Sequence, residues 1–360
     1  MSPPASSLSV SLTPDQQAVF EYQAVKASKE LVKFSQLDHK YIAQLSSQAN
    51  NKTTVETCMS DGAVCARIVV QATLSEIAKL YLPTDHASFQ EYSQRLYPGT
   101  VIEAQHVQTL RASRKRQLTA IRWTAWHVAP IVQPRDFVVL EHNHDCSYRG
   151  QKGWVQSQHS LPSIQSPHFP EYVRGNVVRA GVVCLEVPCR PGWVQVTQIA
   201  QLDLKGALPP WLGRLAATKF AQSIQNLPHR VDEARLSAMD LALPERSLPS
   251  LGETTCGRCQ KHCRAPREHC RKCGFIACID CSAVYSLRVE QGVDFHVRLC
   301  RHCVQTCTSA TNKKEDCDES YAVMKTTSSI FRPSRGCGYP IAEPSMPVRA
   351  SQPFKRYVLL

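Results

Sequence analysis

Cysteine spacing is the feature that most constrains what this chain can fold into. Nine of its 17 cysteines fall between residues 256 and 303. Eight of the nine form four Cys-x-x-Cys pairs, which are Cys256/Cys259, Cys270/Cys273, Cys278/Cys281 and Cys300/Cys303. A gap of two residues lets a tight turn present both sulfurs to one tetrahedral ion, so four pairs supply two closed thiolate shells. The spacing predicts two structural Zn2+ ions, which contribute folding free energy rather than catalysis.

The remaining cysteines of this region have no such spacing. Cys263 is expected to be a bystander, with substitution for a neighbouring ligand as the alternative, and Cys307 has no partner. Disulfides do not persist in a reducing compartment, so metal ligation is favoured over disulfide pairing for the cluster.

Length and charge bound the rest of the interpretation. A chain of 360 residues favours two domains. Its apolar runs, such as 137–140, are far shorter than the roughly 18 residues that span a bilayer, and residues 1–12 lack the features of a secretion signal. We therefore expect a soluble, cytoplasmic protein. The net charge of +12 favours an anionic partner, a membrane surface or nucleic acid, with a solvated basic surface as the alternative. The basic segment 111–117 lacks interleaved aromatic residues, so no nucleic-acid partner is expected.

The hydrophobic pattern changes period along the chain. Helical spacing predicts a helix from Thr13, as a cap before Pro14, to about Gln48, and further helices near 74–82 and 86–97. A strand is predicted over 63–72, and alternating patterns predict strands over 100–110, 116–128, 135–148, 153–161, 175–187 and 192–204. Short turns between these strands imply antiparallel pairing. A helix is then predicted over 209–227, with one apolar face made of Trp211, Leu212, Leu215, Ala216, Phe220, Ile224 and Leu227.

A long helix that closes on a curved antiparallel sheet forms a cup whose interior is filled by side chains or by an apolar guest. Two segments, "PRDFVVL" at 134–140 and "VQVTQIAQLDLKGALPPWL" at 194–212, resemble the START lipid-binding family. The matching residues are Arg135, Asp136, Phe137, Asp203, Lys205, Gly206, Pro209, Trp211 and Leu212. The resemblance covers roughly residues 15–235. It implies a helix-grip fold around a hydrophobic tunnel for one lipid.

The eight-cysteine pattern, with "REHCRKCG" at its second pair and "RLC" at its fourth, resembles the FYVE finger. The resemblance implies cross-brace binding of two Zn2+ ions, one by Cys256, Cys259, Cys278 and Cys281, the other by Cys270, Cys273, Cys300 and Cys303. It also implies phosphatidylinositol 3-phosphate binding through Arg267, His269, Arg271 and Arg298. The chain departs from the family pattern at Glu268, which stands where the motif has a histidine, and the segment 260–266 lacks the family's apolar pair.

The predicted fold class is α+β, a START-like helix-grip domain plus a small double-zinc, cross-brace, FYVE-like domain. The expected divisions are a flexible N-terminus (1–13), the START-like domain (14–235), a linker (236–254), the finger (255–305) and a disordered tail (306–360) that offers a region for protein partners. No nucleotide-binding or hydrolase motif is present, and His142 and His144 are expected at a polar strand end rather than on a metal.

These features predict a non-enzymatic lipid-binding adaptor. Its START-like cup would hold a hydrophobic lipid, and its finger would bind phosphoinositide-containing membrane, with peripheral localisation on endosomes. The alternative is a protein-interaction or ubiquitin-ligase-like zinc scaffold without phosphoinositide binding.

Overall fold

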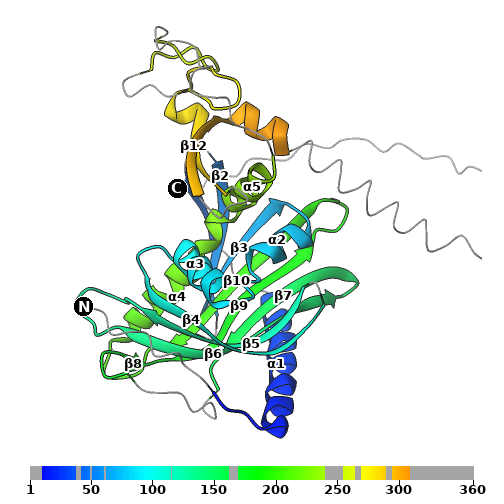
Figure 1. Cartoon of the computed structure of the whole chain (residues 1–360), viewed down its shortest axis with the longest axis vertical. Helices are drawn as coiled ribbons and strands as arrows, with labels where there is room; N and C mark the ends of the chain where they lie inside the picture. The colour runs from blue at the N-terminus through cyan, green and yellow to red at the C-terminus, as the bar shows by residue number, and fades with distance from the viewer. Residues whose placement is uncertain are drawn as a thin grey trace, which may run out of the picture. The chain divides into compact units, whose positions relative to one another are not determined.

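A mainly antiparallel sheet of ten strands wraps around helix α4 in the computed structural model of the chain (Figure 1). The structure describes residues 10–37, 42–48, 51–60, 62–114, 116–161, 169–239, 254–263, 269–288 and 294–308, all within one compact unit, Met1–Thr311. The elements in chain order are α1 (Pro14–Ser35), β1 (Ile42–Gln48), β2 (Asn51–Ser60), β3 (Ala63–Gln71), α2 (Leu74–Leu80), α3 (His86–Leu96), β4 (Val101–Arg114), β5 (Gln117–Trp126), β6 (Arg135–Tyr148), β7 (Gln151–His159), β8 (Val173–Arg174), β9 (Asn176–Glu186), β10 (Trp193–Asp203), α4 (Pro210–Gln222), the 3-10 turn η1 (Ser223–Asn226), α5 (Leu227–Ser237), the 3-10 turn η3 (Ile279–Cys281), β11 (Ser282–Arg288) and β12 (Asp294–Cys300).

The strand order is β1-β2-β3-β10-β9-β7-β6-β5-β4, and the two-residue β8 pairs in parallel with β6. Neighbours from β4 to β7 follow one another along the chain, so the predicted antiparallel pairing is confirmed there. The strand predicted over 63–72 is β3, which pairs with β10 far along the chain. This pairing attaches the N-terminal hairpins to the last strand and makes the sheet long enough to curve around a helix.

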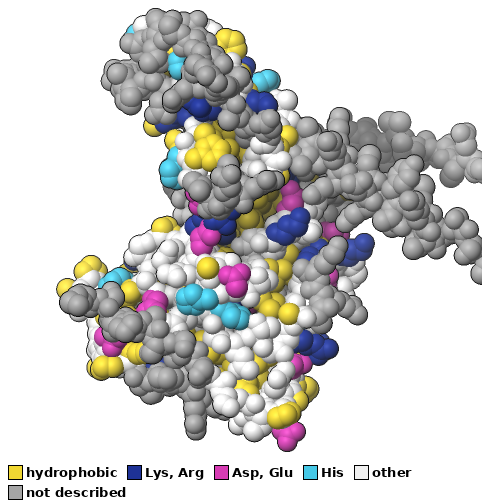
Figure 2. Space-filling view, in the orientation of Figure 1, with side chains coloured by type: hydrophobic (Ala, Val, Ile, Leu, Met, Phe, Trp, Pro, Cys, Tyr) yellow, Lys and Arg dark blue, Asp and Glu magenta, His cyan; other side chains and the backbone are white. Residues whose placement is uncertain are grey.

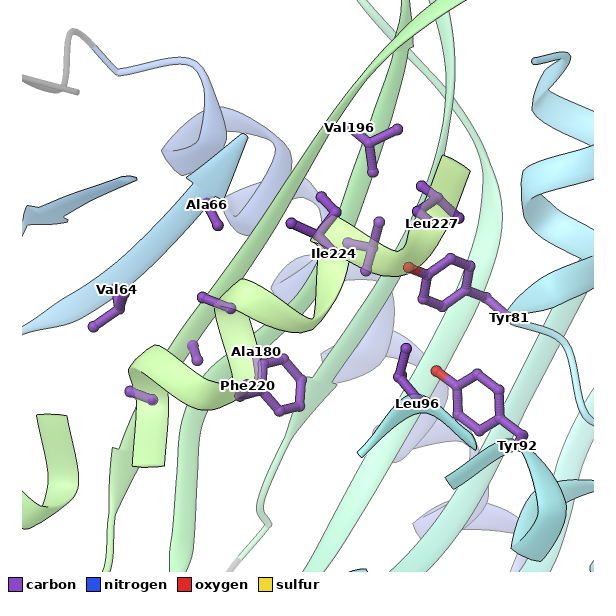
Figure 3. Close-up of a cluster of buried hydrophobic side chains, with 14 of the residues drawn as sticks. Val64, Ala66, Tyr81, Tyr92, Leu96, Ala180, Val196, Phe220, Ile224 and Leu227 are labelled. Atoms are coloured by element: carbon purple, nitrogen blue, oxygen red, sulfur yellow. The ribbon is translucent and has the colours of Figure 1, made fainter. Parts of the chain in front are cut away.

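The two faces of the sheet bury different partners. Val182 and Cys184 of β9 join the interior cluster around α4, whereas the alternate residues Val183 and Leu185 pack with α1 on the opposite face. Because strand side chains alternate between faces, one strand supplies both cores. Figure 3 shows part of the interior cluster, in which Phe220 and Ile224 of α4 and η1 lie among side chains of the strands.

The N-terminal helix is shorter in the structure than the sequence predicts. Helix α1 begins at Pro14 with a Thr13 capping box, as predicted, but it ends at Ser35. Residues 42–48 form β1, whose backbone pairs with β2 from Ile42↔Thr57 to Gln48↔Asn51. Strand β2, which the pattern did not predict, carries several β-branched residues that favour an extended backbone. The helical prediction for 42–48 was therefore wrong, because the pairing with β2 outweighs the helical spacing.

The predicted apolar face of α4 is narrower in the structure. Leu212, Ala216, Phe220, Ile224 and Leu227 are buried as predicted, and α4, η1 and α5 continue one after another. Trp211 and Leu215 are 55% and 38% exposed. Each is adjacent to a buried residue, and neighbouring positions on a helix are rotated by about 100°, so both lie at the edges of the buried stripe.

The C-terminal module is built from the Cys-x-x-Cys turns, the β11–β12 hairpin and a short helix over 301–308. Isolated bridges, Thr255↔His262 and His269↔Ile276, shape the turns. Most of the expected linker and almost all of the expected tail lie outside the described residues. Within the described residues no helix combines the length and hydropathy of a transmembrane span.

Candidate lipid cavity and metal centres

The space between α4 and the sheet is almost completely filled by side chains. A cavity of about 30 Å³ remains, room for about one or two water molecules. Its walls are mostly apolar and include Tyr92, Trp126, Phe137, Ala180 and Phe220. The sequence allowed this interior to be filled either by side chains or by an apolar guest, and in the structure side chains fill it.

A fully buried ion pair lies on the inner face of the sheet. Arg122 of β5 and Glu141 of β6 are both 0% exposed at their side chains, with Nη2 and Oε1 3.5 Å apart. Arg122 pairs with Val139 across the two strands, so Glu141 is its diagonal neighbour on the same face. Burial lowers the pKa of Arg122, and the charge of Glu141 opposes this effect. Neither residue lines the interior cavity.

The polar atoms of this pair are largely occupied by the protein. Arg122 donates to the Pro83 carbonyl at 2.6 Å and contacts His106, and its guanidinium carbon lies 4.4 Å from the Phe89 ring centroid. Glu141 accepts hydrogen bonds from Asn143 and Gln158, each at 2.9 Å. Sequence reasoning missed this pair, although a charged residue between Ile121 and Trp123 in an apolar strand was a signal for it.

The START-like motif residues Arg135 and Asp136 connect β6 to other segments of the fold. Arg135 Nε donates to the Leu204 carbonyl at 3.1 Å, in the turn between β10 and α4. Asp136 accepts from Trp123 Nε1 and pairs with Arg174 at 2.8 Å. Arg135 therefore holds the β10–α4 turn in place, Asp136 links β6 to β5 and β8, and neither side chain lines the cavity.

His142 and His144 do not form a metal site with acidic neighbours. His142 is buried and its Nδ1 lies 2.8 Å from Thr119 Oγ1, while His144 Nε2 lies 2.9 Å from Ser28 Oγ of α1. The metal-compatible groups found among the described residues are both in the cysteine module.

The structure brings the eight cysteines together in two groups of four. One group holds Cys256, Cys259, Cys278 and Cys281, and the other holds Cys270, Cys273, Cys300 and Cys303, with all sulfurs of a group within 4.8 Å of one another. These are the same two sets that the FYVE resemblance implies. Each group could hold one metal ion.

The sulfur spacing fits a tetrahedral ion. Tetrahedral Zn–S bonds of about 2.3 Å place sulfurs about 3.8 Å apart, and the structure has 3.7 Å between Cys259 and Cys278 and 3.9 Å between Cys273 and Cys300. Backbone N–H groups also point at the sulfurs, as from Cys300 to the sulfur of Cys270 at 3.2 Å. Burial opposes ionisation of Cys256, but the backbone N–H groups of Cys278, Cys259 and Arg258 outweigh burial and lower the pKa of Cys256 to about 6. This donor set suits a thiolate-binding metal.

Three of the four predicted head-group residues lie on segments that are adjacent in the structure, and the fourth, Arg267, lies outside the described residues. The backbone N–H of Arg271 donates to the Arg298 carbonyl at 3.0 Å, so the two segments run side by side. His269 is two residues before Arg271, and its Nδ1 lies 2.7 Å from the Gly274 carbonyl. Arg298 also donates to Ser282 at 3.1 Å.

Cys263 and Cys307 are buried but lie outside both groups of four. Cys263 packs with Cys256 and Ile276, and Cys307 packs with Cys303 in the second core of the module.

The START-like domain and the cysteine module share a hydrophobic cluster. Leu236 of α5 is fully buried among residues of the module, such as Leu287 and Leu299. The neighbouring Glu233 accepts the backbone N–H of Ser286 at 2.7 Å. The last helix of one module therefore contributes to the core of the other.

Four charged side chains form a closed ring at the same contact. Glu91 and Arg95 of α3, paired at 3.0 Å, bind Arg288 and Asp294 of the β11–β12 hairpin, which are themselves 3.3 Å apart. Figure 2 shows basic and acidic side chains gathered between α3 and the hairpin. Sequence reasoning did not identify this contact.

The comparisons with known proteins concern the first module. Residues 59–224 match the family model of the START domain. Human StAR-related lipid transfer protein 5 has 16% sequence identity and a TM-score of 0.40, over 59% of this chain and 99% of that one. Human STARD10 has 16% identity and a TM-score of 0.37, over 61% and 83% of the two chains. The human StarD13 lipid transfer and protein localization domain has 18% identity and a TM-score of 0.33, over 54% and 92%.

The family match ends before the cysteine module, so the FYVE-type assignment of 255–305 stays a prediction. The curved antiparallel sheet closed by a C-terminal helix agrees with the helix-grip fold expected from the sequence. Residues 59–224 of this chain are therefore identified as a START domain.

Proposed function

We propose that this chain is a non-enzymatic lipid-binding protein whose START domain holds one hydrophobic lipid between α4 and the sheet. The observation that carries the proposal is the START match over residues 59–224, together with an interior walled mainly by apolar and aromatic side chains. Because the remaining cavity is about 30 Å³, a lipid must displace side chains of the cavity wall, to which α4 contributes Phe220.

Native mass spectrometry of the full chain purified from cells tests this function. The expected result is a protein mass increased by one lipid, whose identity follows from extraction. Ala180→Phe adds bulk to the cavity wall and should reduce the loaded fraction, whereas Ala234→Phe on the exposed side of α5 should not. A chain that carries no lipid, and takes up none from mixed vesicles, would contradict the proposal.

The cysteine module is proposed to bind two Zn2+ ions in the two groups of four cysteines. A bound Zn2+ would cross-link distant segments and stabilise the small module without an open position for substrate. Elemental analysis of the full chain should return two equivalents of zinc. Cys256→Ser should remove one equivalent, while Cys189→Ser, at an exposed cysteine outside both groups, should remove none. Less than two equivalents in the unaltered chain would contradict the assignment.

The module is further proposed to bind phosphatidylinositol 3-phosphate, and so to place the protein on cytoplasmic faces of endosomes. The support is the backbone contact between Arg271 and Arg298, which places two arginines on adjacent segments near His269. Guanidinium groups donate paired hydrogen bonds to phosphate oxygens. Vesicles with and without this lipid should separate wild-type binding from that of Arg271→Ala and Arg298→Ala. Arg149→Ala, in the β6–β7 turn, is the charge-matched control.

If neither Arg271→Ala nor Arg298→Ala changes vesicle binding, the head-group assignment fails. That outcome, with two zinc equivalents retained, would favour the alternative of a protein-interaction or ubiquitin-ligase-like scaffold. A reconstituted ubiquitin-transfer assay distinguishes those two scaffold types.

A further inference from the structure

A cleft opens beside the filled interior of the START domain. It has a volume of about 420 Å³ and lies between the α3–β4 turn, the end of β5 and the helical stretch α4–η1. Side chains that matter for its chemistry are Trp126, His127, Lys219, Phe220 and Asn226. This is more than ten times the volume of the interior cavity.

Three aromatic side chains form a common wall of the cleft and the interior cavity. They are Tyr97, Trp126 and Phe220. Phe220 stacks on both of the others, with ring centroids 4.9 Å from Tyr97 and 5.8 Å from Trp126. In Figure 3 the Phe220 ring lies close to Ala180, which also lines the interior cavity. Rotation of the single Phe220 side chain would therefore join the two spaces.

The residues that line the cleft are basic or uncharged. Lys219 and His127 line it, and none of its fifteen lining residues is acidic. Two polar atoms at the same wall, Trp126 Nε1 and Asn226 Oδ1, are buried and lack a hydrogen-bond partner among the described residues. Buried polar atoms without partners cost free energy. A phosphate oxygen could accept a hydrogen bond from Trp126 Nε1, whereas Asn226 Oδ1 needs a donor, such as a hydroxyl of the ligand.

The deep polar pair of the domain is a poor alternative for the polar end of a lipid. Arg122 and Glu141 do not line the interior cavity, and each already binds neighbouring protein groups. The Phe89 ring also covers the Arg122 guanidinium. A lipid whose chain occupies the apolar interior therefore meets accessible polar groups in the cleft.

We propose that the cleft binds the phosphate-bearing head group of the lipid, with Lys219 and His127 facing the phosphate, while the hydrocarbon chain enters the interior past Phe220. This inference rests on the proposed lipid binding by the START domain. A lysine at the site provides a strong charge-assisted hydrogen bond to phosphate. Phe220 acts as the plug between head-group site and interior.

The test compares two fluorescent lipids with identical acyl chains, phosphatidic acid and diacylglycerol, added to the full chain. The wild type should bind phosphatidic acid more tightly. Lys219→Gln should weaken phosphatidic acid binding about tenfold, equivalent to about 1.4 kcal/mol, and leave diacylglycerol binding within about twofold. Lys79→Gln, on the exposed side of α2, is the charge-matched control and should change neither.

A second variant tests the plug. Phe220→Leu keeps an apolar side chain but removes both ring stacks, and should speed release of both fluorescent lipids several-fold. Unchanged release rates in a folded variant would overturn the role of Phe220. An excess of glycerol 3-phosphate, which has the phosphate without the chains, should displace labelled phosphatidic acid but not labelled diacylglycerol, and equal displacement of the two lipids would overturn the head-group assignment.

The outcomes separate the two proposals. If the wild type binds neither labelled lipid, the cleft assignment fails, whereas the lipid-binding function fails only if native mass spectrometry also finds no lipid on the chain. If it binds both, and Lys219→Gln weakens them equally or not at all, only the head-group assignment is overturned.

Discussion

Removal of the positive charge from the buried Arg122–Glu141 pair should strongly destabilise the START domain. Arg122→Met keeps a long apolar stem but leaves Glu141 buried without an opposite charge. Breaking a buried pair in this way costs roughly 3–5 kcal/mol. Glu141 retains its hydrogen bonds from Asn143 and Gln158, so we expect the lower end, about 3 kcal/mol. For a domain of this size that is a fall in Tm of roughly 6–12 °C.

A double variant separates the charge from the packing. Arg122→Met/Glu141→Gln is neutral and keeps an amide oxygen that can accept from Asn143 and Gln158. It should recover about 2 of the 3 kcal/mol, because the uncompensated carboxylate is gone. Urea unfolding of the wild type, both single variants and the double variant, followed by tryptophan fluorescence, gives the coupling free energy. A cost of Arg122→Met below about 1 kcal/mol, or no recovery in the double variant, would refute the reasoning.

Three further predictions follow from burial and from the metal sites. Burial raises the pKa of Asp232 to about 6 from 3.8, so the free energy of unfolding falls as pH rises between those values. Asp232→Asn should therefore stabilise the protein by about 1–2 kcal/mol at neutral pH and by little near pH 4. Equal unfolding midpoints of wild type and variant at neutral pH would contradict this. Burial lowers the pKa of His142 to about 4 from 6.5, so the free energy of unfolding falls as pH drops between those values. His142→Gln should reduce the slope of unfolding free energy against pH by up to one proton. An unchanged slope in urea titrations would show that His142 does not cause this pH dependence. Chelation of metal should abolish hydrogen-exchange protection of β11 and β12, and persistent protection would show that this hairpin folds without metal.

Most of the sheet was predictable from the sequence. Strands β4 to β10, apart from the short β8, were anticipated because Pro and Gly punctuate the pattern and because β-branched and aromatic residues fill the strands. The prediction failed at β1, where the apolar spacing also fits a helix and only pairing with β2 decides between them. The position of β3 beside β10 depends on long-range pairing that no local pattern reports.

The candidate sites were predictable to different extents. Cysteine spacing indicated the metal groups, because ligands for one ion come in close pairs, and the FYVE resemblance supplied the sets that the structure brings together. The Arg122–Glu141 pair was missed because its two members lie on different strands and meet only through the strand register. The cleft at Lys219 was also missed, since its walls come from α3, β5 and α4, three distant parts of the chain.

Burial of Leu236 inside the cysteine module has a consequence for how the protein comes apart. A fragment cut just after this residue would leave the module with a gap in its core, and the START fragment would lose the partner that covers the end of α5. Loss of metal would unfold the module and expose the end of α5, which follows α4 and η1 directly. The two modules should therefore unfold in one cooperative transition. Metal binding by the cysteines would then raise the Tm of the START domain as well as that of the cysteine module.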